Sequence, residues 1–327
     1  MILPGHDPQA IAQAARTVQS GGLVGFPTET VYGLGADASN DAAVAGIFAA
    51  KGRPADHPLI VHVADAQQIS AYADSVPAYA ARLIEVFWPG PLTLILPRKP
   101  GIAAAAAGGQ DSIGLRCPSH PVALAFLKAC GTGVAGPSAN RFGRVSPTTA
   151  QHVIDELGEG LLVLDGGPCD VGIESSIVDC TRGRPVLLRP GVLTRVQLEA
   201  ACGEPVLAGA DAGAGRPAPR ASGTLASHYA PNARVRLMRA EAIQAAFDLL
   251  GSDAANIAVY ARTIVRIKSE KVLYRRMPDD AGATARQLFA VLRGFDSKGV
   301  KLIWIEEVPS GADWDGVRDR LGRAAAS

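Results

Sequence analysis

Two cations stand one residue apart in the stretch Lys51-Gly52-Arg53-Pro54, between a predicted helix and an apolar strand. Gly52 permits a turn in the backbone between them, and Pro54 cannot continue the helix. Both side chains therefore extend from a turn of defined geometry. An ammonium and a guanidinium placed together suit a bound polyanion such as a nucleotide triphosphate. The alternative is a helix C-terminus whose charges only complement the helix dipole. The stretch is a candidate anion site that requires partners from elsewhere in the chain.

Polar residues follow two further predicted strands. The segment Thr-Glu-Thr at 28–30 comes after the apolar residues 23–26, where strand ends of open α/β sheets line ligand clefts. Ser138 and Asn140 come after the apolar residues 133–136. Each group also fits ordinary turn chemistry. Their function depends on whether the fold brings them to Lys51.

Cations recur at strand ends. Arg116 and Arg189 each close an apolar strand, where a guanidinium requires a carboxylate or phosphate partner. His62 lies inside another apolar strand, the ordinary place of a core histidine. If Arg116 and Arg189 converge with Lys51 and Arg53, they form a positive cleft. We expect such a cleft to act on a phosphate ester by positioning and electrostatics, because no Ser-His-Asp order or paired-carboxylate spacing is present.

Two nucleotide-binding motifs are excluded. Gly33-x-Gly35-x-x-Ala38 matches the dinucleotide fingerprint in letters only, because several residues separate it from the helix cap at Asn40. The chain also has no G-x-x-x-x-G-K-[ST] phosphate loop. A nucleotide therefore requires another kind of binding site.

Composition narrows the class of protein. The hydrophobic content of 48% and charged content of 19% describe a globular α/β chain, and 5% aromatics are few for a single-stranded nucleic-acid surface. Residues 1–200 hold 14 Lys and Arg against 17 Asp and Glu, while the whole chain carries a net +1, so the later part is basic. Stable DNA binding and a membrane span are not expected. Five cysteines without a C-x-x-C pair argue against zinc and disulfides and favour a cytoplasmic protein.

The length of 327 residues predicts more than one domain. Residues 1–202 form the first, in which late strands outnumber helices and predict a mixed sheet. Residues 203–233 are rich in Gly, Ala and Pro and are predicted to be a linker. Residues 234–327 alternate strand and helix, which predicts a small domain with a parallel sheet.

Ten motifs occur in order along the first domain and the end of the linker. They are PTETVYGLG, KGRP, PLIVHV, WPGPLTLIL, GLRCPSHP, PSAN, DGG, GIESSIVD, LLRPG and HYAPN. In these motifs the chain resembles the threonylcarbamoyl-AMP synthase family in its two-domain form. The resemblance implies a YrdC-like twisted mixed sheet with helices and a concave cleft, followed by a Rossmann-like domain, with the linker crossing the cleft. Ser176, where the family commonly has Thr, is a conservative departure.

The resemblance also implies an activity. L-threonine, bicarbonate and ATP give threonylcarbamoyl-AMP and pyrophosphate, in a nucleotidyl transfer assisted by Mg²⁺ that arrives with ATP. No metal site of the protein's own is expected. Downstream proteins then transfer the threonylcarbamoyl group to the tRNA adenosine 3′ of the anticodon.

The family's functional positions carry over to twelve residues of this sequence. Threonine contacts are implied for four of them: Thr28, His62, Arg116 and Ser175. Catalytic and ATP contacts are implied for Lys51, Arg53, Ser138 and Asn140, and further ATP contacts for Ser112, Ser146, Arg189 and Asn232.

Two other functions are consistent with parts of the chain. A double-stranded RNA or tRNA-binding module without ATP turnover would use the concave surface, although the first domain has few lysines. A carbamoyl-transfer enzyme of hydrogenase maturation would require zinc-finger cysteines, which are missing. A run of six cations at 262–276 in the second domain is either a solvated face or a contact for tRNA or a partner protein.

Overall fold

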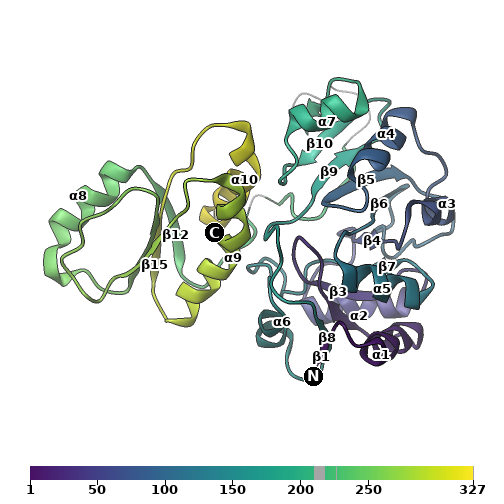
Figure 1. Cartoon of the computed structure of the whole chain (residues 1–327), viewed down its shortest axis with the longest axis horizontal. Coiled ribbons are helices and arrows are strands. Elements are labelled where there is room, and N and C mark those ends of the chain that lie inside the picture. Colours follow the sequence, from purple (N-terminus) through teal and green to yellow (C-terminus); the bar gives the residue numbers. More distant parts are fainter. Residues whose placement is uncertain (210–217, 226, 327) are drawn as a thin grey trace. The chain divides into compact units, whose positions relative to one another are not determined.

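A computed structural model describes residues 1–209, 218–225 and 227–326, and it divides the chain into two compact units (Figure 1). The first unit comprises Met1–Phe142 and Ser146–Thr224, and the second comprises Gly143–Val145 and Leu225–Ser327. The division after Thr224 falls inside the predicted linker. Residues 210–217 and 226 of that linker lie outside the described residues.

The first unit is an α/β assembly of many short strands. Its elements are β1 (Ile2–Pro4), α1 (Pro8–Gln19), β2 (Val24–Phe26), β3 (Gly33–Asp37), α2 (Asp41–Lys51), β4 (Ile60–His62), η1 (Ala66–Gln68), α3 (Ile69–Tyr72), α4 (Ala78–Phe87), β5 (Leu92–Pro97), β6 (Ser112–Arg116), α5 (Pro121–Cys130), β7 (Val134–Ala135), α6 (Ala150–Leu157), β8 (Leu162–Asp165), β9 (Ser176–Asp179), β10 (Val186–Arg189), α7 (Arg195–Cys202) and β11 (Leu207–Ala208).

One mixed sheet connects the described strands of this unit, in the order β1-β8-β2-β3-β7-β4-β6-β5-β9-β10-β11. Neighbours such as β4 and β6 are parallel, whereas β5 and β6 are antiparallel, so the predicted mixed sheet is confirmed. Strand β3 was not predicted, because its glycines suggested a loop. The start of the predicted linker is also part of the sheet, since β11 pairs with β10.

Local signals set the ends of the helices that carry the site. Asp7 caps α1, where its side chain accepts a hydrogen bond from the Gln9 amide, and Pro8 is the first helical residue. Asn40 caps α2 in the same way. At the other end of α2, Gly52 takes a left-handed conformation with φ of 61° and terminates the helix beyond Lys51. The backbone turn predicted at Gly52 is therefore present.

Two apolar clusters hold the sheet and helices of the first unit together. One surrounds Phe26 and Phe126, whose ring centroids are 5.4 Å apart, and packs α1 and α5 against β2 and β8. The other includes Ile47 of α2 and Leu83 of α4. All five cysteines are buried and free. No helix in the described part of the chain is long and apolar enough to cross a membrane.

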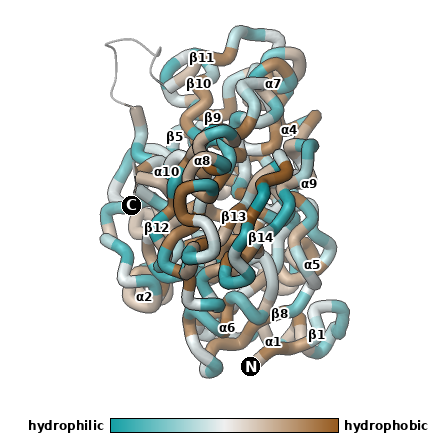
Figure 2. Tube along the Cα trace, turned by 90° about the vertical axis from the view of Figure 1, so that its left-hand side faces the viewer, coloured by the Kyte–Doolittle hydropathy of each residue, from teal (hydrophilic) through white to brown (hydrophobic). Residues whose placement is uncertain are grey.

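The second unit has a small sheet of parallel strands, as the sequence predicts, in the order β12-β15-β13-β14. Around β13 and β14 the chain changes repeatedly between hydrophobic and hydrophilic residues (Figure 2). Its elements are β12 (Arg234–Met238), α8 (Ala240–Leu250), η3 (Gly251–Asp253), β13 (Ile257–Ala261), β14 (Leu273–Arg276), α9 (Ala281–Ser297), β15 (Leu302–Glu306), η4 (Ala312–Trp314) and α10 (Asp315–Ala325).

Candidate active site

Lys51 joins two segments that lie far apart in sequence. Its side chain is 3% exposed, and Nζ donates hydrogen bonds to the backbone oxygens of Ser138, at 2.6 Å, and of Asn140. The loop carrying these oxygens is fixed beside β3, because the Leu34 amide donates to the Pro137 oxygen at 2.8 Å. The predicted meeting of Lys51 with Ser138 and Asn140 is therefore present in the structure.

Arg53 lies beside Lys51 and is also buried. Its guanidinium donates to the Pro58 oxygen at 2.9 Å and lies 5.7 Å from the ring centroid of Phe142. Burial, followed by the charge of Arg53, lowers the pKa of Lys51 well below its ordinary value. Two basic side chains are thus buried close together, where a bound anion would stabilise the charged form of both.

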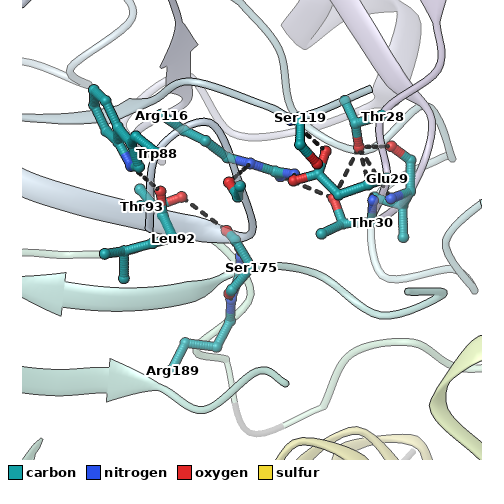
Figure 3. Close-up of polar contacts among 12 residues, drawn as sticks. Thr28, Glu29, Thr30, Trp88, Leu92, Thr93, Arg116, Ser119, Ser175 and Arg189 are labelled. Carbon is teal, nitrogen blue, oxygen red and sulfur yellow. Dashed lines mark hydrogen bonds and ion pairs between the residues drawn. The ribbon is translucent and has the colours of Figure 1, made fainter. Parts of the chain in front are cut away.

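Arg116 organises a second cluster of polar side chains (Figure 3). Its guanidinium forms an ion pair with Glu29 at 2.7 Å and donates to Thr30 Oγ1 at 2.8 Å. The Thr30 hydroxyl lies 2.8 Å from that of Thr28, and Glu29 also accepts from the Ser119 amide. The predicted carboxylate partner of Arg116 is therefore Glu29. The Thr-Glu-Thr segment forms a connected, buried network and not a solvated turn.

His62 lies opposite Arg116 in the register of β4 and β6. Burial and the charge of Arg116 lower the pKa of His62 to about 3, so the ring is neutral near pH 7. Its edge packs against Phe26, at 5.5 Å between ring centroids. Among the described residues, no hydrogen-bond partner reaches Nδ1, which leaves a buried acceptor or donor beside Arg116.

Ser175 and Arg189 form the third group. The Ser175 hydroxyl lies 2.7 Å from that of Thr93, and it accepts from the Arg189 guanidinium at 3.1 Å (Figure 3). Arg189 also donates to the Ser175 oxygen at 3.0 Å and to the Ser222 oxygen at 2.8 Å. A segment of the predicted linker is thereby fastened to the strand end that carries Arg189.

Glu174 connects the groups. Its carboxylate accepts a short hydrogen bond from the Ser146 hydroxyl, and its charge acts on Lys51 to raise the pKa against the larger effect of burial. Two residues earlier, the Gly172 amide donates to the Thr30 oxygen at 3.1 Å. The sequence analysis gives neither Glu29 nor Glu174 a role of its own, although Glu29 belongs to the polar segment 28–30 and both residues lie within the ten motifs. In the sequence, each of these acids is flanked by apolar or hydroxyl residues. An acid in such a setting is rarely exposed to solvent, and this pattern could have indicated that both are buried.

Two predicted residues take no part in the hydrogen bonds described above. Ser112, at the start of β6, nevertheless lines a small pocket with Pro58, Thr93 and Ser222, which are the partners of Arg53, Ser175 and Arg189. Asn232 belongs to the second unit, where its side chain accepts from Arg144 at 2.6 Å. Its predicted contact with ATP stays a prediction.

The donor set does not suit a metal held by the protein alone. Among the described residues there is no group of three or more His, Cys, Asp or Glu side chains that could hold an ion. Mg²⁺ usually binds to one or two carboxylates together with substrate phosphates. Entry of Mg²⁺ together with ATP stays a prediction.

The fold and this site define a YrdC-like α/β enzyme with buried cations at strand and helix ends. Residues 16–191 match the Sua5–YciO–YrdC family model, described as "Telomere recombination", and residues 193–326 match the model described as "Threonylcarbamoyl-AMP synthase, C-terminal domain". The threonylcarbamoyl-AMP synthase of Bacillus subtilis is 38% identical, over 98% of this chain and 94% of that protein. This chain belongs to the threonylcarbamoyl-AMP synthase family and is an enzyme of the nucleotidyltransferase type, as the resemblance implies.

Solved structures agree over nearly the whole chain. A doubly substituted Sua5 from Pyrococcus abyssi has a TM-score of 0.90 and 35% identity, covering 99% of this chain and 96% of that one. P. abyssi Sua5 complexed with L-threonine has a TM-score of 0.87 and 37% identity, covering 98% and 95%. The predicted fold class is confirmed.

Proposed function

We propose that the first unit joins L-threonine, bicarbonate and ATP into threonylcarbamoyl-AMP, with release of pyrophosphate and water. The observation that carries the proposal is the contact of Lys51 with the Ser138–Asn140 loop, in a unit whose Glu174 segment touches both Ser146 and Thr30. One connected network thus supplies cations for a triphosphate and a separate guanidinium for an amino acid.

Arg116 is proposed to bind the threonine carboxylate. The guanidinium has five N–H donors, of which one binds the Gly90 oxygen, one binds Thr30 and one faces Glu29. The remaining donors are available for a carboxylate. Thr28, His62 and Ser175 are proposed to contact the rest of the amino acid, and the neutral ring of His62 suits a hydroxyl or an amine.

ATP is proposed to bind along the Lys51 loop. Lys51 and Arg53 neutralise its phosphates, and Ser138 and Asn140 orient the nucleotide. Further contacts with ATP are proposed for Ser112, Ser146, Arg189 and Asn232. The threonine amine takes up carbon dioxide from bicarbonate to form a carbamate, whose oxygen attacks the α-phosphorus while pyrophosphate leaves. Mg²⁺, when bound with ATP, would supply further charge stabilisation for the leaving group.

The later steps belong to other proteins. We propose that cytoplasmic transfer proteins carry the threonylcarbamoyl group to the tRNA adenosine 3′ of the anticodon. The segment 218–222 is proposed to act as a lid over the nucleotide, since Arg220 pairs with Asp56 at 2.7 Å and Ser222 accepts from Arg189. An RNA-binding module without ATP turnover is not supported, because the curated relatives are named as synthases.

Pyrophosphate release from ATP tests the proposal. We expect release only when L-threonine and bicarbonate are both present, and formation of threonylcarbamoyl-AMP by mass spectrometry. Serine and glycine serve as matched substrates that lack the methyl group or the whole side chain. Equal rates with serine or glycine would refute the assignment of threonine, and release without any amino acid would refute the reaction.

A further inference from the structure

The basic segment 266–276 of the second unit has no part in the chemistry proposed for the first unit. It holds five cations, Arg266, Lys268, Lys271, Arg275 and Arg276, and a single acid, Glu270. The proposed synthase reaction gives it no task, so the surface that it forms requires a separate explanation.

Inward-facing residues at its start anchor the segment to the rest of the unit. Val265 and Ser269 are buried, and the Ser269 hydroxyl donates to the Ala254 oxygen. From α8, Gln244 accepts from the Arg266 amide at 2.8 Å and donates to the Arg266 oxygen at 3.3 Å. Arg266 and Lys268 are exposed between these anchors, with the half-buried Ile267 separating them. A merely solvated loop would not require such anchoring.

The segment continues into β14, which lies at the edge of the sheet. Arg275 and Arg276 are exposed there, next to Tyr274, whose ring is held by a hydrogen bond from its hydroxyl to the Thr263 oxygen at 3.3 Å. Tyr274 is 40% exposed. An exposed aromatic side chain therefore stands next to two exposed cations in the sequence of an edge strand.

The acids near the segment, including the exposed Glu270 beside Lys271, are fewer than its cations. In the described part of the chain, Lys268, Lys271 and Arg275 have no carboxylate within ion-pair distance. Arg276 pairs with Asp279 at 3.4 Å, but both side chains are more than half exposed, so this pair contributes little. On α8, Asp248 accepts from Gln244. The positive potential of the segment is therefore available to an outside anion.

We propose that residues 266–276 bind RNA, with the cations on backbone phosphates and Tyr274 stacked on an unpaired base. Several separate cations at fixed spacing complement a chain of phosphates, and unpaired RNA bases are commonly read by stacking on aromatic rings. An acidic protein would not use the exposed aromatic face in this way. The inference concerns the second unit alone and does not depend on the proposed reaction of the first.

The test uses the full chain and a fluorescein-labelled RNA hairpin with an unpaired loop. The basic-face variant carries Lys268→Glu, Lys271→Glu and Arg275→Glu. The control carries Arg16→Glu, Lys128→Glu and Arg184→Glu, which are exposed cations of the first unit with the same change in charge. Anisotropy is measured between about 50 mM and about 200 mM salt.

We expect the basic-face variant to bind at least about tenfold more weakly and to reduce the slope of log K against log salt by about 2 to 3. The control should change affinity by less than about twofold, and both should release pyrophosphate at the wild-type rate. In a second pair, Tyr274→Ala should weaken binding while Tyr274→Phe keeps it, because a phenyl ring still stacks.

Three results would overturn the inference. They are the absence of hairpin binding by the wild type at low salt, equal losses in the basic-face variant and the control, and equally tight binding of poly-glutamate. The last would identify an acidic protein as the partner.

Discussion

The cations of the candidate site are held mainly by neutral oxygens. Lys51 donates to the backbone of Ser138 and Asn140, Arg53 to that of Pro58, and Arg189 to that of Ser175. A carbonyl oxygen orients a cation without cancelling its charge. Arg116 differs, because the Glu29 carboxylate partly neutralises its charge. The charge that remains suits a ligand with a single carboxylate.

Replacing Lys51 with Met is expected to lower kcat about 10²- to 10³-fold, because a preorganised charge beside the phosphates is lost. Lys51→Arg should not restore the rate, because a planar guanidinium does not fit the position in which two carbonyl oxygens bind the lysine ammonium. Steady-state pyrophosphate release measures both variants.

Lys128→Met is the matched control for this pair, since Lys128 is an exposed lysine on α5. It should leave kcat unchanged. A Lys51→Met enzyme with the wild-type rate would remove Lys51 from the proposed mechanism.

His62 makes the stability of the first unit depend on pH. Its pKa is about 3 in the folded chain, against 6.5 for an ordinary histidine. Between these values the unfolded chain binds a proton that the folded chain does not, so stability is complete above pH 6.5 and falls as pH decreases. We expect about 2 kcal/mol less free energy of unfolding at pH 5 than at pH 7 from this residue, measured by urea titration.

His62→Gln supplies the comparison, because glutamine keeps polar atoms in place but does not titrate. Its unfolding free energy should change less between pH 7 and pH 5 by about the same 2 kcal/mol. An identical pH dependence in both proteins would show that His62 is not the group responsible.

At the scale of elements, the glycines of β3 are explained by packing and not by a ligand. A Cβ on Gly33 would lie 2.8 Å from the Phe26 ring, and one on Gly35 would lie 2.8 Å from Val134. The two glycines that resemble part of a dinucleotide fingerprint therefore leave room for the Phe26 ring to pack against β3. Rejection of the fingerprint was correct, but the strand itself was missed.

Gly33→Ala is expected to destabilise the first unit by about 1 to 3 kcal/mol, because the added methyl group overlaps an aromatic ring that has no room to move. Phe26→Leu in the same chain should recover part of this loss. Denaturant unfolding of the two single variants and the double variant measures the coupling.

Gly46→Ala is the contrasting substitution. Gly46 lies inside α2, and a Cβ there would make only ordinary contacts with Leu23, at 3.6 Å or more. We expect stability to rise by about 0.5 to 1 kcal/mol, because alanine favours the helix. A similar loss at Gly33 and Gly46 would show that backbone conformation, and not contact with Phe26, limits position 33.

Much of the fold follows from local signals. Asp7-Pro8, Asn40 and Gly52 mark helix ends that the structure confirms. The strand order does not follow from such signals, because most strands have five residues or fewer and their neighbours are distant in sequence. Strand β3 was missed because glycine is a poor strand former.

The site was predictable in part. The resemblance brought Lys51, Ser138 and Asn140 together, and the structure agrees. The individual roles of Glu29 and Glu174 were not predicted, because they arise from burial against Arg116 and Ser146, which spacing alone does not reveal.

At the scale of the whole molecule, the proposed threonine contacts all lie in the first unit, whereas Asn232 lies in the second. A fragment ending at Thr224 is therefore expected to fold and to bind L-threonine with an affinity close to that of the full chain. Its affinity for ATP should fall about tenfold or more, because it lacks the HYAPN motif. Calorimetric titration with each ligand measures both.

Asn232→Ala in the full chain separates the side chain from the rest of the second unit. It should weaken ATP binding and leave threonine binding unchanged. Full ATP affinity in the fragment would exclude residues beyond Thr224 from the nucleotide site.

The five buried thiols all belong to the first unit, and burial raises the pKa of Cys117 to about 11 and that of Cys130 to about 12. Alkylating reagents attack thiolates, so they modify these cysteines only when the surrounding fold opens. A time course of alkylation therefore records the opening of the first unit alone. With no cysteine in its own sequence, the second unit is silent in that experiment, so the opening of the first unit can be timed within the intact chain.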